Sequence, residues 1–280
     1  MKYLLGFMFL IASAFAEDST ISTNVAPAPA SEAKVMLGVE LRPSFTTKIG
    51  EAHTENSVVG GYQFNKDSSI YYKQEFNTNI DDPSGKNPGL GLYAFDGSLR
   101  YKEANYFKWG RASLSNELRA YLPTHALKRD AGLITNIRNH MKLKVRHNNV
   151  ISTVVEEIPI AHIYSQSGVV RSASLREANP VFENRIAVGP EIQFLSNLKL
   201  SIPVTLNSVR YGDFQVGAKN NDQWTHKLWA WPELLYSYNA NVNIGLAFYS
   251  DNFITPDFSA IDVVAGLEKG VTQVILSATL

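Results

Sequence analysis

The stretch LITNIRNHMKLKVR, residues 133–146, decides the fold class of this chain. Its odd-numbered and even-numbered residues form two sets of different character. One set is mainly apolar and consists of Leu133, Thr135, Ile137, Asn139, Met141, Leu143 and Val145. The other set begins with Ile134 and Asn136 and then carries the basic residues Arg138, His140, Lys142, Lys144 and Arg146. A period of two is the period of a β-strand, whereas a helix would mix both sets around its circumference.

The same alternation recurs along most of the chain. It is clear at 198–207 and 242–248 and continues through residues 272–280. Weaker copies occupy 35–45, 58–64, 70–76, 93–101, 114–122, 186–194 and 261–267, and segments with an ambiguous face occupy 150–164 and 224–238. Short turns that contain Asn, Asp or Gly alternate with longer polar connections, the first of them expected at 46–57. The pattern predicts an antiparallel meander with tight turns at one end and long loops at the other.

The composition narrows the class of protein. The 280 residues include 26 Lys or Arg, 26 Asp or Glu and no Cys. This balance argues against a strongly basic nucleic-acid-binding surface. The lack of Cys excludes disulfides and metal sites built on thiolates. No stretch approaches the roughly 18 consecutive apolar residues that indicate a transmembrane helix.

The N-terminal residues are expected to stand apart from the strands. Lys2 precedes an apolar run at 3–15, and Ala14 and Ala16 form the small-x-small pattern of a signal peptidase site. We therefore predict an export signal at 1–16. Residues 17–33 are rich in Ser, Thr, Ala and Pro, which predicts a flexible periplasmic arm. The remaining residues, 34–280, form a single β-domain in this interpretation.

Alternation alone leaves open which face of the strands is inside. A soluble periplasmic β-sandwich or lipocalin-like barrel would bury the apolar face, whereas a membrane barrel would turn it toward lipid. Three features favour the membrane barrel. Several segments are long enough to cross a bilayer, which takes about 9 to 11 residues. Short turns alternate with long loops, and aromatic residues gather at segment ends, as in outer-membrane barrels.

Over essentially all of the chain that follows the predicted export signal, residues 17–280, the sequence resembles bacterial outer-membrane β-barrel proteins of the porin-like class. The resemblance rests on the export signal, the alternation, the turn asymmetry and the last segment, 272–280, although that segment ends in Leu280 where the class usually ends in an aromatic residue. The resemblance implies a closed, antiparallel, up-and-down transmembrane barrel in the outer membrane. It also implies contact with outer-membrane lipid and with the barrel-assembly machinery through the last strand. Because such barrels have an even number of strands, we predict twelve, with fourteen as the next choice.

In this barrel the basic residues would line the lumen. We call Arg138, His140, Lys142, Lys144 and Arg146 the basic wall. Other charges predicted in the lumen are Arg100, Arg111, Glu117, Arg119, Glu183, Arg185 and Glu191. Two interpretations stay open, namely a charge-lined pore that favours anions and a lumen closed by paired charges.

Aromatic residues are predicted to anchor the barrel at the membrane interfaces. The candidates are Tyr101, Trp109, Trp229, Trp231 and Tyr236. Trp229 and Trp231 share a face because they are two residues apart. If this face pointed into the lumen, the two indoles would form a platform on which sugars stack.

Catalytic, metal and cofactor sites are not expected. A lipid hydrolase would need a nucleophile and a base on one face, and His162 and Ser165, three residues apart, fall on opposite faces of a strand. The six His residues show no spacing that would bring them together with carboxylates on one face. The sequence thus predicts a narrow porin for small polar solutes, with anions favoured. The alternatives are a non-conducting barrel for surface-loop display or adhesion and a soluble binding protein.

Overall fold

The computed structural model describes residues 34–46, 52–81, 91–172, 175–214, 218–239, 241–250 and 270–279. The predicted export signal, the predicted arm and the predicted strand at 261–267 lie outside these residues. The described elements are β1 (Lys34–Thr46), β2 (Ala52–Gln63), β3 (Ser68–Asp81), β4 (Gly91–Trp109), β5 (Ala112–Leu122), α2 (Ala126–Asp130), β6 (Leu133–Arg146), β7 (Ile151–Tyr164), β8 (Gly168–Ser172), β9 (Leu175–Ala178), β10 (Pro180–Leu195), β11 (Leu198–Ser201), β12 (Val204–Tyr211), β13 (Trp224–Ala230), β14 (Glu233–Ser237), β15 (Val242–Tyr249) and β16 (Val271–Thr279). Among the described residues, no helix has the length and apolar character needed to cross a membrane.

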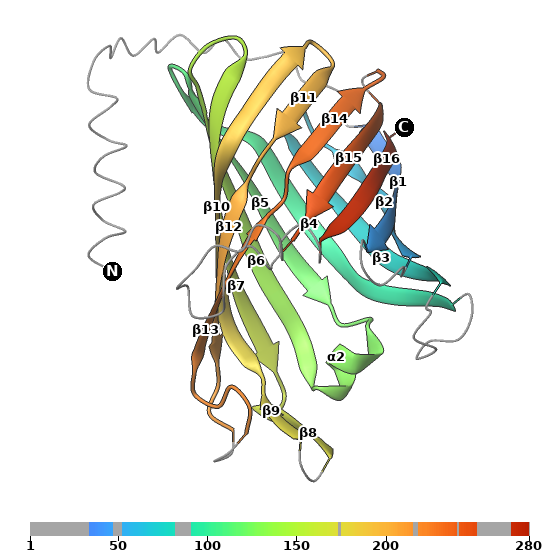
Figure 1. Cartoon of the computed structure of the whole chain (residues 1–280), viewed down its shortest axis with the longest axis vertical. Coiled ribbons are helices and arrows are strands. Elements are labelled where there is room, and N and C mark those ends of the chain that lie inside the picture. Colours follow the sequence, from blue (N-terminus) through green and yellow to red (C-terminus); the bar gives the residue numbers. More distant parts are fainter. Residues whose placement is uncertain are drawn as a thin grey trace. The chain divides into compact units, whose positions relative to one another are not determined.

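One antiparallel sheet closes on itself (Figure 1). Neighbours in the sheet follow chain order from β1 to β7, then β10, and β16 returns to pair with β1 over Gly38–Thr46. Across this seam, Gln273 Nε2 donates to Ser44 Oγ at 3.1 Å on the inner face. The sheet closes through the pairing of β10 with β11. β13 pairs along its length with β12, and on its other side the described residues make a single bridge, between Ala230 and Ser250.

Two barrel strands are each broken into two segments at a proline. β10 pairs with both β12 and β11, which are separated at Ile202 and Pro203. β13 and β14 are separated at Trp231 and Pro232. Proline cannot donate a ladder hydrogen bond, and Gly189 opposite this break has no room for a Cβ because the Ile202 carbonyl oxygen would lie 2.1 Å from it. The fourteen paired segments therefore make twelve barrel strands, which confirms the predicted closed barrel and its strand number.

Tight turns and long connections lie at opposite ends of the barrel, as predicted. Tight turns follow β2, β4, β6, β10 and β14, and the long connections include α2 and the β8–β9 hairpin (Figure 1). Three tight turns use the same device, in which Asn65, Asn148 and Asn239 each accept two backbone N–H groups through Oδ1 at 2.7–2.8 Å. The predicted loop at 46–57 is wrong in extent, because β2 already begins at Ala52.

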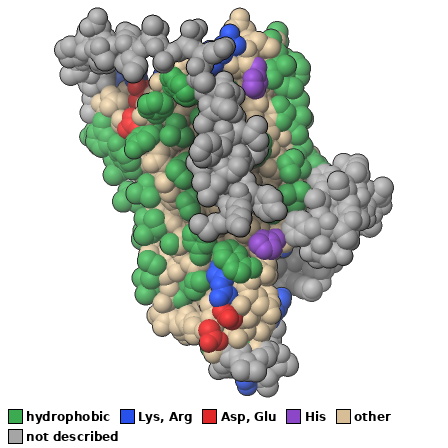
Figure 2. Space-filling view, turned by 90° about the vertical axis from the view of Figure 1, so that its left-hand side faces the viewer, with side chains coloured by type: hydrophobic (Ala, Val, Ile, Leu, Met, Phe, Trp, Pro, Cys, Tyr) green, Lys and Arg blue, Asp and Glu red, His purple; other side chains and the backbone are tan. Residues whose placement is uncertain are grey.

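The outer face of the barrel is apolar. On β1, Val35, Leu37, Val39, Leu41 and Phe45 are all exposed, Val35 by 60% and Phe45 by 47%. Ten residues at a rise of about 3.3 Å, tilted by about 40°, span about 25 Å, which is the height of a lipid-facing band. Figure 2 shows hydrophobic side chains over much of the described surface on this side, while most Lys, Arg, Asp and Glu side chains in view lie toward the two ends.

The inner face carries the polar side chains. Ser44, Ser57, Ser98, Asn136 and Gln273 are buried, whereas Ile202 and Leu246 are exposed by 37% and 54%. Apolar side chains on the outside and polar ones on the inside are the reverse of a soluble domain. The barrel therefore has the membrane arrangement, and the soluble-sandwich alternative does not fit it.

A few polar residues interrupt the outer band. β7 runs in regular register through Glu156 and Glu157, so Glu156 faces inward and Glu157 outward. Glu157 Oε1 accepts a hydrogen bond at 3.2 Å from Asn184 Nδ2 on β10. This bond gives the outward carboxylate a partner within the barrel wall.

Candidate functional site: a charged lumen

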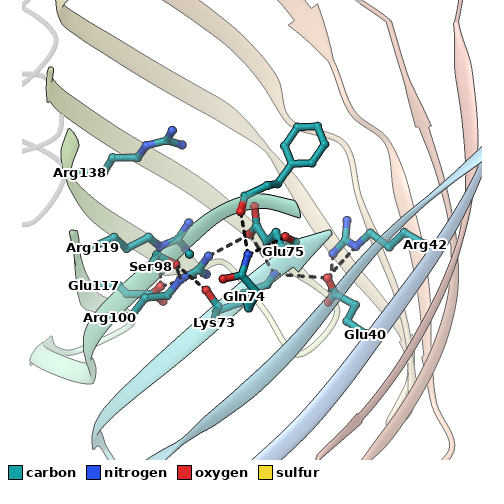
Figure 3. A network of polar contacts seen from close by, with 12 residues as sticks. Glu40, Arg42, Lys73, Gln74, Glu75, Ser98, Arg100, Glu117, Arg119 and Arg138 are labelled. Carbon is teal, nitrogen blue, oxygen red and sulfur yellow. Dashed lines mark hydrogen bonds and ion pairs between the residues drawn. The ribbon is translucent and has the colours of Figure 1, made fainter. Parts of the chain in front are cut away.

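A continuous set of ion pairs runs along the inner wall from β1 to β5 (Figure 3). We call it the charged belt, and it consists of Glu40, Arg42, Lys73, Glu75, Arg100, Glu117 and Arg119. Lys73 Nζ lies 3.6 Å from Glu40 and 3.4 Å from Glu75. Arg100 lies 3.1 Å from Glu75 and 3.7 Å from Glu117. Arg42 pairs with Glu40 at 3.0 Å and Arg119 with Glu117 at 2.5 Å, so each belt cation has a carboxylate partner.

Three arginines form a row across neighbouring strands. Arg100 on β4 is the register partner of Arg119 on β5, and Arg119 is the register partner of Arg138 on β6. Like charges directly opposite each other are unfavourable unless they are compensated. The belt carboxylates compensate Arg100 and Arg119. Arg138 instead lies 4.1 Å over the ring of Tyr121 and donates to Asn136 Oδ1 at 3.0 Å.

The structure places the basic wall along β6, on the face that carries Arg119 and Glu117. His140 Nδ1 lies 3.1 Å from Glu156, and Lys144 Nζ forms an ion pair with Glu191. Within the described ranges, no ion pair shorter than 4 Å joins Arg138, Lys142 or Arg146 to a carboxylate. The inner wall near β6 therefore has an excess of positive charge.

The remaining predicted lumen charges fall into two smaller clusters. Glu183 lies 2.6 Å from Arg185 and 3.4 Å from His162 Nε2. Glu191 pairs with Lys144 and, at 3.5 Å, with Lys199. Sequence reasoning did not include Tyr121 or Glu156 among the site residues. The period of two puts Tyr121 on the face of Arg119, but the residues that it contacts across strands are not visible in the sequence.

Arg111 differs from its predicted place. It lies in the tight turn between β4 and β5, after Gly110 with its φ of +53°, and it is exposed. Its Nη1 donates to the His147 carbonyl oxygen at 3.0 Å. Because it belongs to a turn and not to a strand, alternation cannot place it on an inner face. It lies at the rim of the barrel.

Cavities follow one another along the basic side of the lumen. A cavity of about 290 Å³ at the rim is lined by Arg111, Lys144 and Arg146. The next, of about 350 Å³, shares Lys144 and extends to Lys142 and Arg119. A third, of about 430 Å³, shares Arg119 and is lined by the charged belt. Because Lys144 lines the first two cavities and Arg119 the last two, the three lie next to one another between the tight-turn end and the charged belt.

Trp229 and Trp231 are inward, which corrects the prediction that they are interfacial anchors. Trp229 is the register partner of Thr205, which is buried on the inner face, and it lies 5.5 Å from the Arg185 guanidinium. Trp231 lines the 430 Å³ cavity together with belt residues. The aromatic character of this strand suggested a lipid contact, but the register, which the sequence does not show, turns both indoles inward.

Tyr101, Trp109 and Tyr236 lie on the outside, where they were predicted. Their exposed fractions are 45%, 43% and 39%. Other exposed aromatic residues at the same end are Tyr62, Phe64, Tyr106, Phe107, Phe194 and Tyr238. The tight-turn end therefore carries a girdle of aromatic side chains, as the interfacial zones of outer-membrane barrels do.

Two hydroxyl groups are hydrogen-bonded to imidazoles, and His162 and Ser165 are not such a pair. Ser165 Oγ donates to the Gly132 carbonyl oxygen at 3.1 Å, whereas His162 contacts Glu183. His226 Nδ1 lies 2.9 Å from Ser208 Oγ on the outer face, and its ring stacks on Trp224. His147 Nε2 lies 2.8 Å from Thr153 Oγ1. In the part of the chain that the structure describes, no group of three or more His, Asp or Glu could hold a metal ion.

The architecture is similar to that of solved outer-membrane channels. The NanC porin is 12% identical to this chain, with a TM-score of 0.52 over 86% of this chain and all of the porin. An outer-membrane channel from Pseudomonas putida F1 is 11% identical, with a TM-score of 0.57 over 92% of this chain and all of the channel. No protein-family model matches the sequence, and neither does any curated protein. The likeness at these identities establishes the fold, that of an outer-membrane channel barrel.

Proposed function

We propose that this chain is an outer-membrane channel that conducts small polar solutes and prefers anions. The observation that carries the proposal is the excess of positive charge on the inner wall near β6. Lys142 and Arg146 each line one of the cavities, and neither they nor Arg138 on the same face has a carboxylate partner within 4 Å among the described residues. Unpaired cations on a pore wall raise the local concentration of anions and exclude cations. The similarity in fold to porin and channel structures is consistent with this function.

The membrane environment follows from the same model. The apolar outer band would contact outer-membrane lipid, and the aromatic girdle would lie at the interface on the tight-turn side. We place the tight turns in the periplasm, because outer-membrane barrels have short turns there and long loops outside. β16, the strand that closes the sheet, would carry the signal that the barrel-assembly machinery reads.

Conductance in a planar lipid bilayer tests the proposal. We expect discrete channels in potassium chloride and, under a salt gradient, a reversal potential displaced toward the chloride equilibrium potential. A folded barrel without any conductance would support the alternative of a closed display or adhesion barrel, in which the ion pairs of the charged belt fill the lumen. A reversal potential on the potassium side would contradict the anion preference alone.

A further inference from the structure

Three aromatic rings gather on the inner face next to the breaks in β13/β14 and β11/β12. The ring centroids of Trp229 and Tyr249 are 6.0 Å apart, at an interplanar angle of 59°. Those of Trp231 and Tyr249 are 5.4 Å apart, at 64°. Inner faces of membrane barrels are normally polar. Three adjoining aromatic side chains on this face therefore need an explanation other than contact with lipid.

A cation adjoins the aromatic cluster. The Arg185 guanidinium lies 5.5 Å from the Trp229 ring, which is within the range of cation–π attraction. Arg185 also pairs with Glu183 at 2.6 Å. One edge of the cluster therefore adjoins an ion pair whose guanidinium faces the Trp229 ring.

Trp231 lines the same cavity as residues from the opposite wall of the barrel. β4 lies halfway round the closed strand order from β13/β14. Nevertheless, Phe95 of β4 and Arg119 of β5 line the same 430 Å³ cavity as Trp231. The cavity is thus lined by aromatic residues from two opposite walls, Phe95 and Trp231, and by the guanidinium group of Arg119.

The indole of Trp231 has an unused donor. Its Nε1 is buried and has no hydrogen-bond acceptor among the described residues. A buried N–H group without a partner is unfavourable, and Trp normally finds one. An oxygen acceptor of a solute reaches this N–H when the indole turns it toward the cavity.

We propose that Trp229, Trp231 and Tyr249 form a subsite for small carboxylates that carry an aromatic or a sugar ring. The ring of the solute would lie against the indole faces, and its carboxylate would accept from Trp231 Nε1 or pair with Arg119. This subsite rests on the proposed channel function, since it names the solute class that the lumen favours. A carboxylate without a ring makes the ionic contact only.

Saturation-transfer difference NMR on the full chain, folded in detergent, tests the subsite without any need for conductance. The probes are benzoate, glucuronate and acetate, which offer an aromatic ring, a sugar ring and no ring. We expect benzoate, glucuronate or both to bind with a lower half-saturation concentration than acetate. Each ring contact contributes about two- to tenfold in affinity. The probe that binds best distinguishes aromatic acids from sugar acids.

Substitutions locate the binding. Trp231→Leu is expected to raise the half-saturation concentration of the ring-bearing probe to near that of acetate, and Trp231→Phe, which keeps a ring but removes the N–H, is expected to have a smaller effect. Trp109→Leu, on the outer face, is the matched control and should leave binding unchanged. Each variant is shown to be folded when the boiled protein migrates more slowly on a gel than the unboiled protein. If Trp231→Leu does not fold, Trp231→Phe and Trp229→Leu test the subsite instead.

Two results would overturn the subsite. One is equal binding of all three probes to the native chain. The other is ring-selective binding that persists unchanged in the folded Trp231 and Trp229 variants. Ring-selective binding without conductance would instead refute the channel while supporting the subsite. Conductance together with equal binding of all three probes would support the channel and refute the subsite.

Discussion

Neutralising Arg138 and Lys142 together with glutamine is expected to remove most of the preference for chloride over potassium. Both side chains lie on the basic wall without a carboxylate within 4 Å in the described residues. A unit charge at about 4 Å contributes about 1 kcal/mol even at the dielectric constant of water, which is about fivefold in the partition of a monovalent ion. The reversal potential under a salt gradient should therefore move close to zero in the double variant.

A matched control separates position from net charge. Lys219 lies in a long connection, is exposed, and forms an ion pair with Glu177 at 3.8 Å. Lys219→Gln removes one charge at the far end of the barrel from the basic wall and should leave the reversal potential nearly unchanged. If Lys219→Gln altered selectivity as strongly as the double variant, the basic wall would not be the filter.

A single arginine at Leu246 is expected to destabilise the folded barrel strongly. Leu246 lies in the middle of β15, is exposed by 54%, and faces outward. On the surface of a soluble protein, an exposed leucine can be replaced by a charged residue at little cost in stability. On a lipid-facing surface, an arginine near the bilayer midplane costs about 2–4 kcal/mol. Guanidinium unfolding of the barrel in phospholipid vesicles measures the change in the free energy of unfolding.

Asn243→Arg on the same strand provides the comparison. Asn243 faces inward, where its amide contacts Ser237 and Ser277. Because this face is polar, arginine there should cost less than about 1 kcal/mol, in line with the tolerance of lumen positions to substitution. Equal stability of the Leu246→Arg and native barrels would contradict the lipid-facing assignment.

Most of the fold could be predicted from local patterns. The alternation at 133–146 defines β6 to within a residue, because one face of the strand contacts lipid and the other contacts the aqueous lumen. The turn signals Asn65, Asn148 and Asn239 could be read because an Asn side chain bonds its own backbone two or three residues ahead. An even number of strands could also be predicted, since an antiparallel barrel closes only with an even number of crossings, but this did not decide between twelve and fourteen.

Features that depend on register could not be predicted. Arg100, Arg119 and Arg138 form a row only because three strands pair at those residues, and Ser208 meets His226 across 18 positions of sequence. The inward direction of Trp229 and Trp231 has the same origin. Pro203 and Pro232 interrupt the two strands concerned, so the alternation is weakest just where the aromatic cluster lies. Arg111 was misplaced because a turn has no inner face.

The central claim is that apolar side chains of each strand face lipid and the charged ones face a watery lumen. Since the chain has no Cys, a single cysteine at each position from 137 to 144 can carry a nitroxide label in vesicle-embedded protein. We predict that labels at Ile137, Asn139, Met141 and Leu143 respond mainly to oxygen dissolved in the lipid. Labels at Arg138, His140, Lys142 and Lys144 should respond mainly to a water-soluble nickel complex. The opposite phase, or no alternation along β6, would contradict the account.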